Sequence, residues 1–92
     1  MYYLLLYDLV DGYLERREPY RDAHLQRVRD AADRGELVLA GAFADPADGA
    51  ALVFRGGDRS VAERFAEDDP YVRAGLVAGY RVRDWTVVVG GD

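Results

Sequence analysis

The residues best suited to chemistry include the only histidine of the chain, His24. An imidazole titrates near neutral pH, so it can serve as a general acid or a general base. Arg21 lies three residues earlier, so both side chains project from one face of a helix. A buried arginine needs an anion, which is either a protein carboxylate or a group of a bound substrate. The pair therefore predicts a polar site that binds a small anionic molecule.

Asp69 is the expected third member of this site. In the functional interpretation its carboxylate orients and polarises His24, and Tyr71 lines the same pocket and binds substrate. Each residue also has a structural interpretation. Asp69 is placed to be the N-cap of a short helix opened by Pro70, and Tyr71 can simply fill the core. His24 can be a buried ring bonded to a backbone carbonyl, and Arg21 can extend along the helix edge to water.

The residue types that are missing narrow the chemistry further. The chain has no cysteine and no lysine, which excludes thiolate and Schiff-base chemistry. One histidine without cysteine cannot build a zinc site of the usual kind. Ser60 is the only serine and is better placed to cap a helix than to act as a nucleophile. Gly56-Gly57 is a turn without a phosphate-binding pattern. We therefore expect neither a metal nor a cofactor.

Composition limits the partners and the location. The chain has 92 residues and a formal net charge of −5, with every one of its 12 basic residues an arginine. Nucleic acids and anionic membranes need a basic footprint, so neither is an expected partner. No apolar run approaches the ~20 residues of a membrane span. Residues 1–6 lack the basic flank of a signal peptide, so we expect a cytoplasmic protein.

The elements that must position these residues begin with a strand over 2–9. Both faces of this strand are apolar, so both must be covered. A helix is predicted from Pro19 to about Arg34, ending at Gly35. On a helical wheel His24 and Arg21 fall within its apolar arc, which also contains the following residues: Tyr20, Leu25, Val28, Ala31 and Ala32.

The second half of the chain predicts a hairpin, a helix and a last strand. Residues 36–43 and 50–55 form the hairpin. Ser60 and Glu63 form a capping box that opens a helix, and this helix ends before Pro70. A short turn over 71–74 stops at Gly75, and the last strand covers about 80–89.

The order β-α-β-β-α-β predicts a ferredoxin-like α+β fold in a single domain, residues 1–92. Four antiparallel strands carry two helices on one face of the sheet. The other face is left open although the first strand is apolar on both sides. We therefore expect a homodimer or a higher homo-oligomer that covers this face.

Several of these segments together resemble the YCII-related (YciI-like) domain family. Arg21-Asp22-Ala23-His24-Leu25, Gly35-Glu36-Leu37 and Ala40-Gly41 resemble its first half. Asp48-Gly49, the run Phe65 to Tyr71 containing Asp69-Pro70-Tyr71, Gly75-Leu76 and Trp85 resemble its second half. Ala42 departs from the pattern, since many members have proline there.

The resemblance implies a ferredoxin-like dimer of the α+β barrel type, whose histidine and aspartate are suspected to be catalytic. Carried over, these are His24 and Asp69. One characterised relative removes chloride from a chlorinated muconolactone, and muconolactone isomerases of similar fold move protons on such rings. The hypothesis is a small lyase or isomerase that acts on a carbonyl, lactone or carboxylic acid. The alternatives are a non-catalytic ligand-binding or oligomerisation module and, with less support, a cofactor-free monooxygenase.

Overall fold

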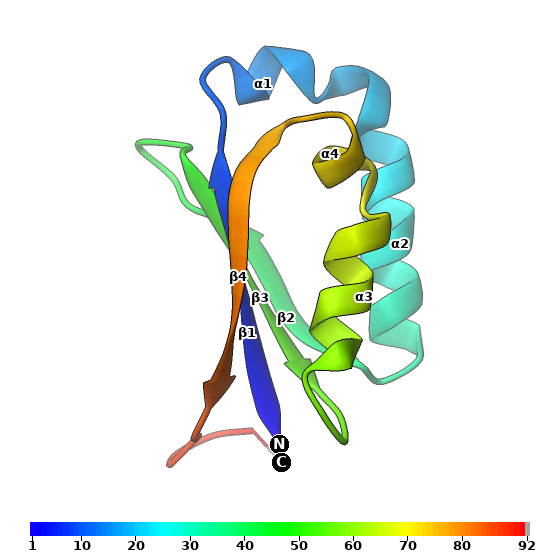
Figure 1. The fold of residues 1–92 in the computed structure, drawn as a ribbon, viewed down its shortest axis with the longest axis vertical. Helices are drawn as coiled ribbons and strands as arrows, with labels where there is room; N and C mark the ends of the chain where they lie inside the picture. The colour runs from blue at the N-terminus through cyan, green and yellow to red at the C-terminus, as the bar shows by residue number, and fades with distance from the viewer. Residues whose placement is uncertain (92) are drawn as a thin grey trace.

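A computed structural model describes residues 1–91. It confirms the predicted order of strands and main helices and adds short helical turns before the first long helix (Figure 1). The elements are β1 (Tyr2–Leu9), α1 (Tyr13–Arg16), the 3₁₀ helix η1 (Glu18–Tyr20), α2 (Arg21–Asp33), β2 (Leu37–Ala42), β3 (Gly49–Arg55), α3 (Ser60–Asp68), α4 (Pro70–Arg73) and β4 (Val77–Trp85).

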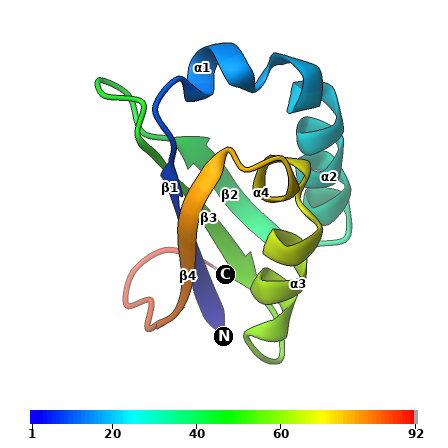
Figure 2. The same cartoon turned by 45° about the horizontal axis from the view of Figure 1, so that its top comes forward.

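The four strands form one antiparallel sheet in the order β2-β3-β1-β4. β1 is therefore a central strand, paired on both edges. Helices α2 and α3 lie side by side on one face of the sheet, and α1 lies across its upper end (Figures 1 and 2). This is the ferredoxin-like arrangement that the sequence predicted.

The core lies between the sheet and these helices. Tyr3, Leu5 and Tyr7 alternate along β1 and are all buried on the helix-facing side. Phe54 of β3 and Phe65 of α3 pack against each other in the same layer, with ring centroids 5.2 Å apart. The alternate residues of β1, among them Leu4 and Leu6, are half-buried on the opposite face. No helix within residues 1–91 is long and apolar enough to cross a bilayer.

The predicted end of the last strand was wrong. β4 starts earlier than expected, at Val77, and ends at Trp85 rather than near residue 89. Trp85 pairs with Tyr2, the first residue of β1. Beyond this pair the neighbouring strand supplies no further partner, so the run of valines leaves the sheet, and Val88 and Val89 are each 89% exposed.

Two details of the helices also differ from the prediction. Ser60 does not cap α3, because Asp58 comes first and its Oδ1 accepts the Ser60 N–H at 2.8 Å. Ser60 then belongs to the first turn of the helix. Tyr20 lies in η1, where a residue turns the chain by about 120° instead of 100°, so the wheel misplaced it and its side chain is 40% exposed.

Candidate active site

Asp69 is the centre of the candidate site and is completely buried. It occupies the N-cap of α4 in an extended conformation, and its Oδ1 accepts the backbone N–H of Tyr71 at 3.0 Å. Pro70 between them has no N–H to satisfy and fits the first position of a helix. The Asp-Pro-Tyr sequence thus holds the carboxylate in one orientation, with acceptor capacity left for two further groups.

His24 of α2 makes the second contact with this carboxylate. Its Nδ1 lies 2.8 Å from Asp69 Oδ1. A carboxylate oxygen only accepts, so the shared hydrogen belongs to Nδ1, and in the neutral ring Nε2 carries the lone pair. Nε2 makes no hydrogen bond to residues 1–91, and the side chain is 13% exposed. The structure thus brings together His24 and Asp69, which are 45 residues apart in the sequence.

Tyr7 completes the set of donors around Asp69, and the sequence analysis missed it. Its hydroxyl donates to Asp69 Oδ2 at 2.6 Å from the inner face of β1. Burial, together with the adjacent negative charge of Asp69, raises the pKa of Tyr7 well above its ordinary value. Tyr7 therefore remains a donor. The only sequence signal was its inward position in the alternation of β1, since its partner lies 62 residues away.

Tyr71 fixes the plane of the histidine ring. The two rings are stacked, with centroids 3.8 Å apart and an angle of 7° between their planes, while Tyr13 contacts Tyr71 edge-on at 5.7 Å. The Tyr71 hydroxyl is buried and has no hydrogen-bond partner in the described chain. Burial, reinforced by Tyr13, raises the pKa of Tyr71 to about 12. This phenol is therefore protonated at neutral pH.

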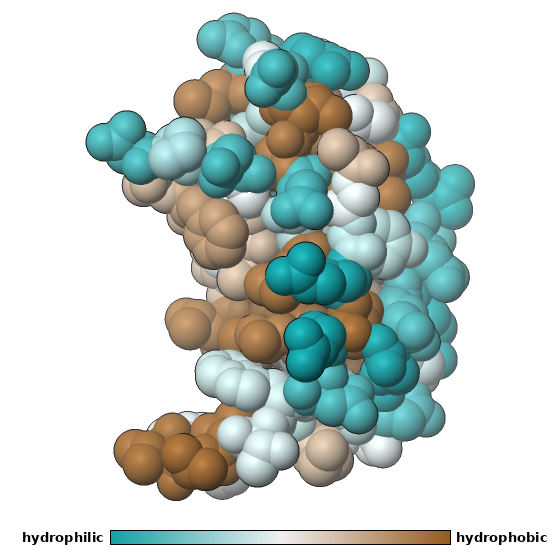
Figure 3. Space-filling model, turned by 60° about the vertical axis from the view of Figure 1, so that its left-hand side comes forward, coloured by the Kyte–Doolittle hydropathy of each residue, from teal (hydrophilic) through white to brown (hydrophobic). Residues whose placement is uncertain are grey.

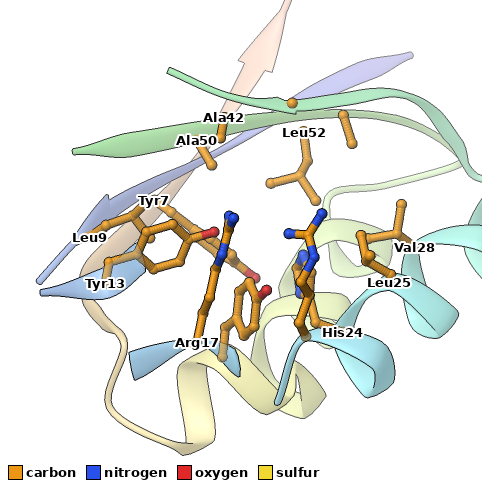
Figure 4. Close-up of a pocket in the computed structure, with 14 residues that line it drawn as sticks. Tyr7, Leu9, Tyr13, Arg17, His24, Leu25, Val28, Ala42, Ala50 and Leu52 are labelled. Atoms are coloured by element: carbon orange, nitrogen blue, oxygen red, sulfur yellow. The ribbon is translucent and has the colours of Figure 1, made fainter. Parts of the chain in front are cut away.

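These residues border a pocket of about 290 Å³ between the helices and the sheet (Figure 4). Its polar lining comes from Tyr7, Tyr13, Arg17, Arg21, His24 and Tyr71, and its apolar lining from Leu9, Leu25, Val28, Ala40, Gly41, Ala42, Ala50 and Leu52. The pocket thus combines one free imidazole nitrogen with guanidinium and phenol groups in an otherwise apolar wall. This combination suits proton transfer on a small anionic molecule.

Arg21 lies on the wall of this pocket, as the sequence predicted, and is half-buried. Arg17, which the analysis missed, lies on the same wall with its guanidinium 5.4 Å from the centre of the Tyr13 ring. Neither arginine has a carboxylate within 4.0 Å in the described residues. Arg17 lies between α1 and η1, two short elements that were not predicted, so no pattern in the sequence singled it out.

Within residues 1–91, no group of three or more His, Cys, Asp or Glu side chains is arranged to hold a metal ion. Among side chains that bind metals, only His24 contacts Asp69, and the pocket lining contains no carboxylate.

Comparisons with known proteins extend this description. The family model of the YCII-related domain matches residues 1–86. No curated protein matches the sequence. Among solved structures, the chain is similar to 5-chloro-2-hydroxyhydroquinone dehydrochlorinase from Burkholderia phenoliruptrix AC1100, in complex with 2,5-dihydroxybenzoquinone. The TM-score is 0.78 and the identity 23%, with 94% of each chain covered, so this likeness shows the shared fold.

Proposed function

Because this chain belongs to the YCII-related domain family, we propose that it is a lyase or isomerase of small molecules. In this proposal His24 and Asp69 transfer a proton on a carbonyl, lactone or carboxylic acid substrate. The observation that carries it is the geometry of His24, whose Nδ1 is bonded to a buried carboxylate while Nε2 stays free beside the pocket. A structural neighbour that is a dehydrochlorinase in complex with a dihydroxybenzoquinone supports a small cyclic substrate.

The proton is taken by His24 Nε2 from a carbon next to a carbonyl. The electron pair of the broken C–H bond moves to the carbonyl oxygen, and Asp69 stabilises the imidazolium that forms. Arg21 binds a substrate carboxylate or the developing oxyanion. An isomerase then returns the proton to another carbon, whereas a lyase expels a leaving group such as chloride as the carbonyl re-forms. General-base work of this kind contributes ~10²–10⁴-fold.

Tyr7 and Tyr71 support this chemistry without taking the proton. Tyr7 holds the far oxygen of Asp69 at 2.6 Å, so the carboxylate cannot rotate away from the imidazole. Tyr71 covers one face of the ring and directs the free nitrogen edge-on toward the pocket. In this proposal Tyr71 forms part of the pocket lining beside the imidazole, which gives it the substrate-binding role expected from the sequence.

The test is hydrogen–deuterium exchange at carbon, followed by NMR in D₂O with hydroxyquinones, small lactones and keto acids. The wild type should exchange or convert at least one of these compounds. His24→Gln and Asp69→Asn should slow that reaction by ~10²–10⁴-fold. Asp68→Asn is the matched control, because this neighbouring carboxylate is 60% exposed, and it should react like the wild type. An unchanged rate in His24→Gln would contradict the proposal.

A second candidate function is a ligand-binding module without turnover. The observation that favours it is the structural role of Asp69 as the N-cap of α4, which accounts for a buried carboxylate without catalysis. If this is the function, His24→Gln will change the dissociation constant of the ligand, and no variant will alter a rate. The exchange experiment above separates the two functions directly.

We also propose that the open face of the sheet is covered by a second copy of the chain. Leu39 of β2 pairs with Val53, which in turn pairs with Leu4, so the three form an apolar row on this face. Leu39 is 69% exposed, and Trp85 of β4 is 42% exposed. Hydrophobic surface gathers toward the concave left side and lower end in Figure 3. An exposed apolar sheet face of this kind is typical of an interface.

A further inference from the structure

The pocket beside His24 has an unusual balance of charge for this chain. The whole sequence has 17 acidic residues against 12 arginines. The lining of the pocket nevertheless includes Arg17 and Arg21 and no aspartate or glutamate. Asp69 lies behind the imidazole, and its oxygens already accept three hydrogen bonds. The pocket is therefore a locally positive site in an acidic protein.

Other arginines of the chain form ion pairs where a carboxylate is near. Arg34 pairs with Glu36 at 2.9 Å, and Arg73 pairs with Asp68 at 3.1 Å, both on the exposed surface. Arg17 and Arg21 are half-buried in a largely apolar wall and have no such partner within the described chain. A partly desolvated guanidinium without an anion is unfavourable, so each of the two is suited to accept an anionic group from a ligand.

Both arginines line the pocket from the segment that precedes and opens α2. Arg17 lies between α1 and η1, and Arg21 is the first residue of α2. Figure 4 shows the Arg17 side chain extending from the helices toward the sheet, on the side of Tyr13. Its guanidinium lies over the Tyr13 ring, with Cζ 5.4 Å from the ring centre. Arg17 thus keeps its position without a ligand.

The size of the pocket limits what such a ligand can be. A volume of about 290 Å³ is at the small end for ligand pockets, which typically measure ~300–1,000 Å³. Leu25, Val28 and Leu52 are among the apolar residues of the lining, which favours a ligand with an apolar body. The space suits one ring or a short unsaturated chain.

We propose that this pocket selects a small ring or unsaturated chain that carries two anionic groups, with Arg21 binding one and Arg17 binding the other. Arg17 is then a specificity-determining residue for diacids. The inference rests on the proposed function for the reaction of the ligand, but the selection itself is a property of binding and can be measured without turnover.

The test compares benzoate with the ortho, meta and para benzenedicarboxylates as probes. Binding is followed by the ring resonances of His24, which need no assignment among histidines because it is the only one. At least one dicarboxylate should bind roughly tenfold or more tighter than benzoate, the value of one charge-assisted bidentate pair. In Arg17→Gln this preference should fall to about threefold or less, with the affinity for benzoate little changed.

Arg16→Gln is the matched control, because it removes the same charge from the neighbouring exposed position outside the pocket lining. It should keep the preference of the wild type. Arg17→Lys keeps the charge but loses the planar fork, so it should show an intermediate preference and serves if Arg17→Gln fails to fold. Equal binding of benzoate and all dicarboxylates, an equal effect of Arg16→Gln and Arg17→Gln, or no dicarboxylate binding up to about 10 mM would each overturn the inference.

Failure of the proposed function looks different. In that case no compound would undergo exchange, or His24→Gln would react like the wild type, while the dicarboxylate preference and its loss in Arg17→Gln would persist. Calorimetry with His24→Gln measures the preference without the histidine signal, and it should match the wild type if selection depends on the arginines.

Discussion

Asp69→Asn is the substitution that probes the fold and the site together. The buried carboxylate accepts hydrogen bonds at 2.6 Å from Tyr7, 2.8 Å from His24 and 3.0 Å from the Tyr71 N–H. A hydrogen bond to a charged group contributes about twice as much stability as one between neutral groups. Neutralising Asp69 therefore lowers the contribution of each of its three hydrogen bonds by about 1 kcal/mol. Relief from burying a charge offsets part of this total of about 3 kcal/mol.

The expected net loss in the free energy of unfolding is therefore about 1–3 kcal/mol. In a domain of this size such a loss lowers the thermal midpoint by about 4–20 °C. The variant should still fold, because asparagine is also a good N-cap for α4. Asp68→Asn is the control, since Asp68 is 60% exposed and pairs only with Arg73 on the surface, and its stability should change by less than about 0.5 kcal/mol.

The same variant should keep the tautomer of His24 and reverse the hydrogen bond with Tyr7. The Tyr71 N–H and His24 Nδ1 both lie against Oδ1, so the asparagine oxygen is favoured at that position and its NH₂ group replaces Oδ2, where it donates to the Tyr7 hydroxyl. Nitrogen-15 NMR of the single histidine distinguishes the two tautomers and should show Nδ1–H in both proteins. If Asp69→Asn is no less stable than Asp68→Asn, or if its ring carries the hydrogen on Nε2, our account of the hydrogen bonds around Asp69 is refuted.

Three further predictions concern single positions. Burial raises the pKa of Tyr71 from 10.0 to about 12, so stability present below pH 10 should be lost as the pH rises toward 12, and urea unfolding should show a smaller alkaline loss in Tyr71→Phe. Hydrogen bonds from Ser60 lower the pKa of Asp58 below its ordinary value of 3.8, so Asp58→Ala should destabilise α3 at neutral pH. In unfolding curves its difference from the wild type should shrink as the pH falls below 3.8 and Asp58 becomes protonated in the folded state. Leu39→Asp should shift the assembly toward monomer in analytical ultracentrifugation. The control Leu14→Asp, at a 51% exposed site on α1, should leave the assembly unchanged. If the two variants sediment alike, the sheet face is not the interface.

The sequence was sufficient for the fold because its signals are local. The alternation of β1 placed Tyr3, Leu5 and Tyr7 on one face, and all three are buried there. Gly35 and Gly75 were expected to end their helical segments, and both have the positive φ that favours glycine, 79° and 78°. The end of β4 could not be predicted from its valines, because it depends on where its partner β1 begins.

The site could be predicted only where a residue carried its own signal. His24 and Arg21 stand out as polar residues on an apolar arc, and Asp69 stands out before Pro70. Tyr7 looks like an ordinary core residue in its strand, and its role depends on a hydroxyl that meets Asp69 across 62 residues of sequence. Arg17 precedes the proline at which we expected the helix to begin, and it reaches the pocket from the short turns of α1 and η1, which were not predicted.

The arrangement of Asp69 joins the fold to the site. A carboxylate that served only as the N-cap of α4 would need one oxygen and could face water, as helix caps commonly do. Asp69 is instead fully buried, with its second oxygen held by β1 through Tyr7 and its first shared between α4 and the histidine of α2. Three elements thus meet at one charged group, so a shift of any of them moves the imidazole. The free nitrogen of His24 is therefore positioned with the rigidity of the core, as accurate proton transfer requires.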